Sequence, residues 1–245
     1  MEGLLLLTPP RSGSTAMAAF MAQSPAIGGL QRRFEGQWLV DDLRDDDRWD
    51  GAKPRAYDRI GAVWREAAAR AVENQPAIRF FVEKSPPNMV RYREIAALFD
   101  RVRVVISNRD PYACVSSDGY RRHGFEGLGT AERLTRVEEL AGRWLRFGRI
   151  LKGIAEREGY ARTSYEAFCA EPAGLFACFG LAGDLAAEAD RRHRVRVKDY
   201  PAQPVRNMND EQIAKLSAAE IARIGEVLER DSDVPDFFGY AIRPG

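Results

Sequence analysis

The sequence predicts an α/β protein with a central parallel β-sheet flanked by helices. Short apolar runs bounded by glycine, proline or charged residues have the length of buried strands, and amphipathic stretches with helical spacing lie between them. Strands that alternate with helices favour parallel pairing, because each helix returns the chain to the same edge of the sheet. No internal repeat or low-complexity linker is present, so we expect a single domain over residues 1–245.

The strands are rich in leucine, β-branched and aromatic residues, and are predicted at 4–7, 78–83 and 102–107, with a weaker one at 160–165. The helices have apolar residues on one face and are predicted at 14–23, 54–73, 87–99 and 130–158. The stretch 210–230 predicts two helices separated at Ser217, a residue type that can cap the second.

Composition excludes several classes of partner. The net charge of +1 gives no overall attraction to nucleic acid or membranes, so any anion site must be local. No apolar run approaches the roughly 20 residues that span a bilayer. The three cysteines are widely spaced without a CxxC pair, which favours reduced thiols over disulfides or a metal site. We expect a soluble, cytoplasmic protein of undetermined oligomeric state.

The loop after the first predicted strand has the composition of an anion-binding site. It places Arg11, Ser12, Gly13, Ser14 and Thr15 between a strand and a helix. A helix N-terminus presents unpaired backbone N–H groups and the positive end of the helix dipole. The Walker pattern of ATPases and kinases requires Gly-Lys followed by Ser or Thr, which this loop lacks. The loop therefore predicts a phosphate or sulfate site.

A cation follows each of three predicted strands: Arg11, then Lys84 in Lys84-Ser85-Pro86, then Arg109 in Asn108-Arg109-Asp110-Pro111. In an open parallel sheet, ligands bind beyond the carboxyl ends of the strands. One such residue alone is more often a surface charge. Three at successive strand ends favour a single site for a ligand with several negative groups.

These motifs resemble those of the sulfotransferases that use 3′-phosphoadenosine-5′-phosphosulfate (PAPS). Residues 8–15 resemble their 5′-phosphosulfate loop, and 108–111, with Ser117 eight positions after Arg109, resemble their 3′-phosphate motif. Lys84-Ser85-Pro86 is similar to the Lys-Thr-Pro of the bacterial, carbohydrate and tyrosyl-protein branches. The remaining similar segments are 164–168, 171–172, 207–209 and 236–240, so the likeness spans nearly the whole chain.

The resemblance implies the P-loop, nucleotide-kinase-like fold of that family. It also implies metal-independent, in-line transfer of a sulfuryl group from PAPS to a hydroxyl, less often an amine, of a small-molecule, sugar or peptide acceptor. Arg11 and Lys84 would bind the phosphosulfate and stabilise the leaving phosphate, and the backbone of 12–15 with the Ser14 and Thr15 hydroxyls would cradle it. Arg109 and Ser117 would hold the 3′-phosphate, as a guanidinium fork and a hydroxyl donor can.

The acceptor hydroxyl needs a general base. The histidine of the aryl and steroid branch is absent, because the sequence at that point is Pro86-Pro87-Asn88. The carbohydrate and tyrosyl-protein branches use a glutamate in the stretch after the first loop, and Glu35 lies there. A surface glutamate paired with a neighbouring arginine is an equal alternative for Glu35, and His123 is the second candidate base.

Further positions carry two interpretations each. Tyr165 matches the family's nucleotide-stacking aromatic but is equally suited to the core. Arg121, one turn beyond Ser117, is either a phosphate contact, as in the tyrosyl-protein branch, or part of a solvated helix face. One of Lys198, Arg206 and Lys215 would close over the nucleotide.

Residues 41–50 contain six aspartates and two arginines around Trp49. So many carboxylates without a matching histidine or glutamate favour a solvated helix or lid surface over a metal site. If this acidic segment borders the cleft, it would favour a cationic or amino-bearing acceptor.

Two other function classes remain open. A Mg²⁺-dependent P-loop kinase needs a lysine where Arg11 stands, and Asp110 is the one loose candidate for holding Mg²⁺. A non-catalytic nucleotide-binding scaffold would explain the missing histidine, but the presence of Arg11, Lys84 and Arg109 argues against it. We expect no nucleic-acid or membrane partner.

Overall fold

The computed structural model has a five-stranded sheet at its centre, and it describes residues 1–181, 183–187, 189, 195 and 202–244. The strand order is β2-β3-β1-β4-β5, and every neighbouring pair is parallel. The strands are β1 (Glu2–Leu7), β2 (Ile27–Gly29), β3 (Phe80–Glu83), β4 (Arg101–Asn108) and β5 (Ala161–Ser164). The predicted fold class, a parallel sheet flanked by helices, is confirmed.

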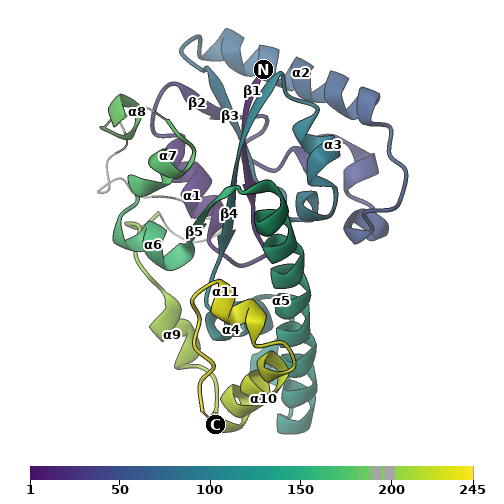
Figure 1. Cartoon of the computed structure of the whole chain (residues 1–245), viewed down its shortest axis with the longest axis vertical. Helices are drawn as coiled ribbons and strands as arrows, with labels where there is room; N and C mark the ends of the chain where they lie inside the picture. Colours follow the sequence, from purple (N-terminus) through teal and green to yellow (C-terminus); the bar gives the residue numbers. More distant parts are fainter. Residues whose placement is uncertain (182, 188, 190–194, 196–201, 245) are drawn as a thin grey trace.

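Helices cover both faces of the sheet (Figure 1). One face packs against α1 (Ser14–Met21), α6 (Tyr165–Ala170), α7 (Gly174–Cys178) and α8 (Gly183–Ala187). The other face packs against α2 (Tyr57–Asn74), α3 (Tyr92–Ala96) and the C-terminal part of α5 (Thr130–Glu158). Beyond the carboxyl edge of the sheet, α5 continues into a bundle with α4 (Pro111–Arg122), α9 (Asn209–Ile213), α10 (Ala218–Glu229) and α11 (Asp233–Phe237).

The run of leucines in β1 follows from burial on both faces. Leu4 and Leu6 pack toward Met17 of α1, whereas Leu5 and Leu7 pack on the opposite face. Side chains of a strand alternate between faces, so a central strand of a doubly covered sheet is apolar throughout. This burial fixes the register of β1, and with it the position of the loop that follows.

Two sequence expectations about elements need correction. Strand β2 was not predicted, because Ile27-Gly28-Gly29 is too short and glycine-rich to give a strand pattern. The helix predicted over 87–99 is wrong in its first half, which is the 3-10 segment η4 (Pro86–Arg91). Arg91 leaves the helical conformation with φ −144°, and its guanidinium donates to the carbonyls of Arg48 and Asp50, each at 2.8 Å.

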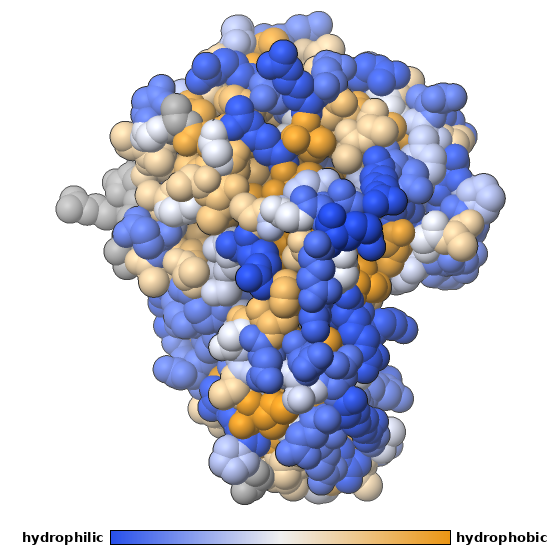
Figure 2. All heavy atoms as spheres, in the orientation of Figure 1, coloured by the Kyte–Doolittle hydropathy of each residue, from blue (hydrophilic) through white to orange (hydrophobic). Residues whose placement is uncertain are grey.

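The helical bundle agrees with the sequence pattern. Helix α5 has the predicted bounds, and Ser217 caps α10 through a reciprocal pair of hydrogen bonds with Glu220. On the face shown in Figure 2, hydrophilic side chains cover much of the bundle, as expected for helices whose apolar faces are turned inward. Within the described part of the chain, no helix has the length and apolar character needed to cross a membrane.

Candidate active site

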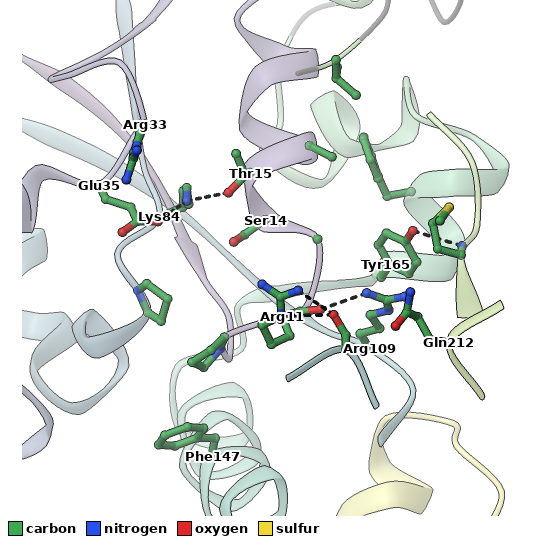
Figure 3. A pocket seen from close by; sticks show the side chains of 18 of the residues that line it. Arg11, Ser14, Thr15, Arg33, Glu35, Lys84, Arg109, Phe147, Tyr165 and Gln212 are labelled. Atoms are coloured by element: carbon green, nitrogen blue, oxygen red, sulfur yellow. Dashed lines mark hydrogen bonds and ion pairs between the residues drawn. The ribbon is translucent and has the colours of Figure 1, made fainter. Parts of the chain in front are cut away.

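The carboxyl ends of β1, β3 and β4 open into one cavity of about 570 Å³ (Figure 3). Arg11, Lys84 and Arg109 all line this cavity, each from a different strand end. The sequence therefore predicted correctly that the three cations lie together. Ser14, Thr15, Glu35, Ser117 and Tyr165 line it as well.

The loop between β1 and α1 has an unusual backbone. Gly13 has φ 77°, and a β-carbon at this position would lie 2.3 Å from the Tyr165 ring. Arg11 has φ 72°, which is uncommon for a residue other than glycine and is found at sites that constrain the backbone. Helix α1 starts at Ser14, so its first-turn N–H groups lie at the cavity. The Ser12 side chain points away, buried beside Cys114, which leaves its backbone as the part able to contribute.

Lys84 and Glu35 form a buried ion pair at one end of the cavity. The Lys84 Nζ donates to Glu35 Oε1 and, at 2.8 Å, to Thr15 Oγ1. An ammonium has three N–H donors, so beside these two acceptors among the described residues one donor is left for a ligand. Burial lowers the pKa of Lys84, while the Glu35 carboxylate opposes this effect.

The Glu35 carboxylate accepts three hydrogen bonds. Its Oε2 accepts from Gln37 Nε2 at 2.9 Å and from Trp38 Nε1 at 2.7 Å, in addition to the Lys84 bond on Oε1. Burial acts to raise the pKa of Glu35, but the Lys84 charge and the three hydrogen bonds outweigh it and hold the pKa below its usual value. A carboxylate offers about four lone-pair positions, so about one remains for a further donor. The alternative of a surface ion pair with a neighbouring arginine does not describe this geometry.

A second buried carboxylate, Glu83, holds the segment that carries Glu35. It accepts from the backbone N–H of Gly36 at 2.6 Å and of Ser85 at 2.8 Å, and from Asn88 Nδ2 at 3.0 Å. Burial raises the pKa of Glu83 to about 7 against the lowering effect of these hydrogen bonds. Sequence reasoning missed this residue, although a carboxylate inside the strand run Phe80-Phe81-Val82-Glu83 is a visible signal.

Arg11 and Arg109 meet Ser117 at the other end. Arg11 donates to Ser117 Oγ from Nε at 3.1 Å and from Nη2 at 2.7 Å. Arg109 donates from Nη1 to the Arg11 carbonyl at 3.1 Å and from Nε to Asn209 Oδ1 at 2.8 Å. Its third nitrogen, Nη2, is buried without a hydrogen-bond partner among the described residues. An unpaired buried donor is costly, and a phosphate oxygen would satisfy it.

Tyr165 lies between the two arginine-bearing loops. Its ring faces Gly13, and the Arg109 guanidinium carbon lies 4.1 Å from the ring centroid. Its hydroxyl donates to the Arg206 carbonyl at 3.0 Å and accepts from the Met208 N–H at 3.2 Å. The ring thus lines the cavity and packs in the core at the same time, and its contact with a nucleotide stays a prediction.

A polar network missed by sequence reasoning holds Arg109. Asn209 Nδ2 donates to Glu166 Oε1 at 2.6 Å, and the Tyr240 hydroxyl donates to Glu166 Oε2 at 3.0 Å. These three residues belong to the later segments that carried the family resemblance. Their hydrogen bonds give a physical reason for that likeness.

Two other candidates lie outside the cavity lining. His123 is a neighbour of Asp118, with Nε2 at 3.8 Å from Oδ2, and burial lowers its pKa. Arg121 is exposed on α4, and the next residue, Arg122, lines the cavity in its place.

Of the three late cations, Arg206 lines the cavity and pairs with Glu211, whereas Lys215 is absent from the lining. Lys198 falls outside the described residues. No group of three His, Cys, Asp or Glu side chains that could hold a metal ion is found in the described part of the chain.

Comparisons with known proteins bear on the family and the fold of the chain. A sequence model of the sulfotransferase family matches residues 4–176. The solved structure of sulfotransferase STF9 from Mycobacterium avium aligns with a TM-score of 0.58 at 13% identity, covering 99% of this chain and 78% of that one. The sulfotransferase domain of the Synechococcus PCC 7002 olefin synthase gives a TM-score of 0.53 at 15% identity, with 99% and 96% coverage.

A sulfotransferase from Alicyclobacillus acidocaldarius aligns with a TM-score of 0.51 at 16% identity, covering 94% of this chain and 97% of that one. At these identities the structural likeness establishes the fold, including its P-loop-like character. A search of curated proteins found no match. The family match covers most of the chain, and the chain belongs to the sulfotransferase family.

Proposed function

We propose that this protein is an enzyme that transfers a sulfuryl group from PAPS to a hydroxyl of a small-molecule, sugar or peptide acceptor. The observation that carries the proposal is the convergence of Arg11, Lys84 and Arg109 on a cavity whose described lining has a single carboxylate, that of Glu35. Such a cavity suits a donor with negative groups at both ends.

The residues present fit this donor. The unpaired Nη2 of Arg109, together with Ser117, would take the 3′-phosphate. The remaining Lys84 donor, the Ser14 and Thr15 hydroxyls and the N-terminus of α1 would take the 5′-phosphosulfate, with Arg11 between the two ends. The proposed ligands of the nucleotide come from the ends of β1, β3 and β4 and from the helices α1 and α4 that follow β1 and β4.

When bound, PAPS supplies the sulfuryl group: sulfur bonds to the acceptor oxygen, and the S–O bond to the 5′-phosphate breaks with its electron pair left on the phosphate. Glu35, ionised at neutral pH because its pKa is low, uses its remaining lone-pair position to accept the acceptor's proton. Lys84 directs its free donor at the oxygen where negative charge grows, in a buried setting that strengthens this interaction. The Lys84–Thr15 bond keeps the ammonium pointed toward the loop.

A calorimetric titration tests the donor assignment. The purified protein is titrated with 3′-phosphoadenosine 5′-phosphate (PAP) and with ATP, each with EDTA and with added Mg²⁺. Binding of PAP in the low micromolar range that EDTA does not alter supports the proposal. Binding of ATP that depends on Mg²⁺, without PAP binding, would favour a kinase, and binding of neither nucleotide would contradict the proposed donor site.

A further inference from the structure

The cavity holds more positive charge than the donor proposal uses. Its described lining contains nine basic side chains and one carboxylate. Three of the nine bind the donor in our proposal, Arg206 pairs with Glu211, and Arg122 and Arg143 share Asp118. The remaining three, Arg33, Arg48 and Arg146, have no carboxylate partner among the described residues.

Two of these arginines lie next to a stacked aromatic pair, Arg146 in space and Arg48 in sequence. The rings of Trp49 and Phe147 lie 4.6 Å apart between centroids at an interplanar angle of 22°, and both line the cavity. The guanidinium carbon of Arg146 lies 5.2 Å from the Phe147 centroid. Arg48 directly precedes Trp49 and donates to the carbonyls of Asp45 at 3.1 Å and Arg44 at 3.4 Å. The result is an aromatic wall formed mostly by the half-buried Trp49, because Phe147 is only 3% exposed and Arg146 lies over its ring.

The acidic segment 41–50 borders the cavity without presenting its carboxylates there. None of its aspartates is among the lining residues, whereas Arg48 and Trp49 are. Asp45 pairs with Arg55 and Lys53, and Asp47 also pairs with Lys53. The hydrogen bond from Arg55, with further contributions from Lys53, lowers the pKa of Asp45 to about 2 against the opposing effect of burial. The segment therefore gives the cavity a positive edge, and the expectation of a cationic acceptor loses its basis.

This wall lies away from the nucleotide side. In Figure 3, Phe147 stands on the side of the pocket opposite Tyr165 and Gln212, with Arg11 between them. Trp38, whose ring nitrogen bonds Glu35, also lines the cavity. An acceptor lying against Trp49 and Phe147 would thus have the proposed base within the same cavity.

We propose, building on the sulfotransferase function above, that the acceptor is a flat, aromatic hydroxyl compound bearing a carboxylate or phosphate group, which Arg48 and Arg146 bind beside the Trp49–Phe147 stack. Guanidinium groups recognise both oxyanions through paired hydrogen bonds. Uncompensated cations in a cleft raise the local concentration of an anion and discriminate against an ammonium group. The exposed part of Trp49 supplies an aromatic contact surface for the flat part.

A charge series tests this inference by binding alone. The protein is saturated with PAP, and ligand-observed NMR titrations then give the Kd of 4-hydroxyphenylacetate, 4-hydroxyphenylacetamide and tyramine, which differ in one group: carboxylate, neutral amide or ammonium. We expect the carboxylate to bind at least tenfold more tightly than the amide, and the ammonium most weakly. In Arg48→Gln and in Arg146→Gln the carboxylate advantage should fall at least threefold, with PAP affinity changed less than threefold.

Arg149→Gln is the matched control, because Arg149 lies on α5 like Arg146 but bonds Asp231 outside the cavity. This variant should keep the full preference for the carboxylate probe. The inference is overturned if the three probes bind equally, if the ammonium binds best, or if none of them binds. In each of these cases, binding of PAP would still support the donor site. If the Arg48 and Arg146 variants lose as much affinity for PAP as for the carboxylate probe, these arginines bind the donor, and the inference is overturned as well. Absence of PAP binding by the wild-type protein would instead refute the proposed function.

Discussion

Replacing Arg109 with alanine should weaken the binding of a nucleotide only if that nucleotide carries a 3′-phosphate. The structure commits Nε and Nη1 of this guanidinium to Asn209 and to the Arg11 carbonyl, which leaves Nη2 for the ligand. One hydrogen bond to a charged group contributes about 1.5–3 kcal/mol, or roughly 10- to 150-fold in Kd. We therefore expect Arg109→Ala to raise the Kd of PAP by that factor.

The assay is a cycle of two ligands and two proteins. Isothermal titration gives the Kd of PAP and of adenosine 5′-phosphate for wild type and Arg109→Ala, and the 3′-phosphate contribution is the difference between the two ligands. The affinity for adenosine 5′-phosphate should fall less than threefold in Arg109→Ala. Arg101→Ala, at the far, exposed end of β4, serves as the control and should bind both ligands as wild type does.

Arg109→Lys keeps the charge but not the fork, and should give an intermediate loss. Thermal denaturation of each variant separates a binding effect from unfolding, since alanine leaves Asn209 Oδ1 without its present partner. An equal loss of affinity for both nucleotides would refute the assignment of Arg109 to the 3′-phosphate.

Three further predictions concern the Lys84 end of the cavity. Glu35→Gln should lower kcat about 10²- to 10⁴-fold and change the Kd of PAP less than threefold, as steady-state kinetics and titration would measure; unchanged kcat would transfer the role of base to another group. Lys84→Ala should lower kcat by roughly 10²-fold or more through loss of charge stabilisation at the leaving oxygen, and a kcat within threefold of wild type would contradict this. Burial raises the folded-state pKa of Glu83 from 4.5 to about 7, so protonation of this carboxyl stabilises the folded state. The contribution, about 3 kcal/mol, is fully present below the unfolded-state pKa and is lost as pH rises through 7. Urea denaturation should therefore give a weaker fall of stability between about pH 5 and pH 8 in Glu83→Gln than in wild type, and identical pH profiles would contradict the raised pKa.

The strands and the meeting of the cations were predictable because both depend on local pattern and on a general rule. An apolar run such as 4–7 specifies a buried strand, and parallel strands bring the residues at their carboxyl ends to one edge. Helix α5 was predicted with the same bounds because its apolar residues recur at helical spacing over a long stretch. Strand β2 lacks both signals, since it is an edge strand of three residues.

The arrangement of the cavity wall depends on contacts between distant residues. The sequence around Glu83 does not indicate that its carboxylate accepts a hydrogen bond from the N–H of Gly36, 47 positions away. The composition of segment 41–50 is acidic, but the charged side chain that it places at the cavity is the cation Arg48. The reason is that Lys53 and Arg55 bind its aspartates away from the cavity. Sequence composition gives the charges of a segment, and only folding decides which of them face a ligand.

The most direct test of the proposed donor site is a crystal structure of the protein grown with PAP. The account predicts the 3′-phosphate within hydrogen-bond distance of Arg109 Nη2 and Ser117 Oγ, and the 5′-phosphate at the N-terminus of α1 beside Lys84 Nζ. A nucleotide bound in the reverse direction, or bound outside the cavity at the ends of β1, β3 and β4, would contradict it.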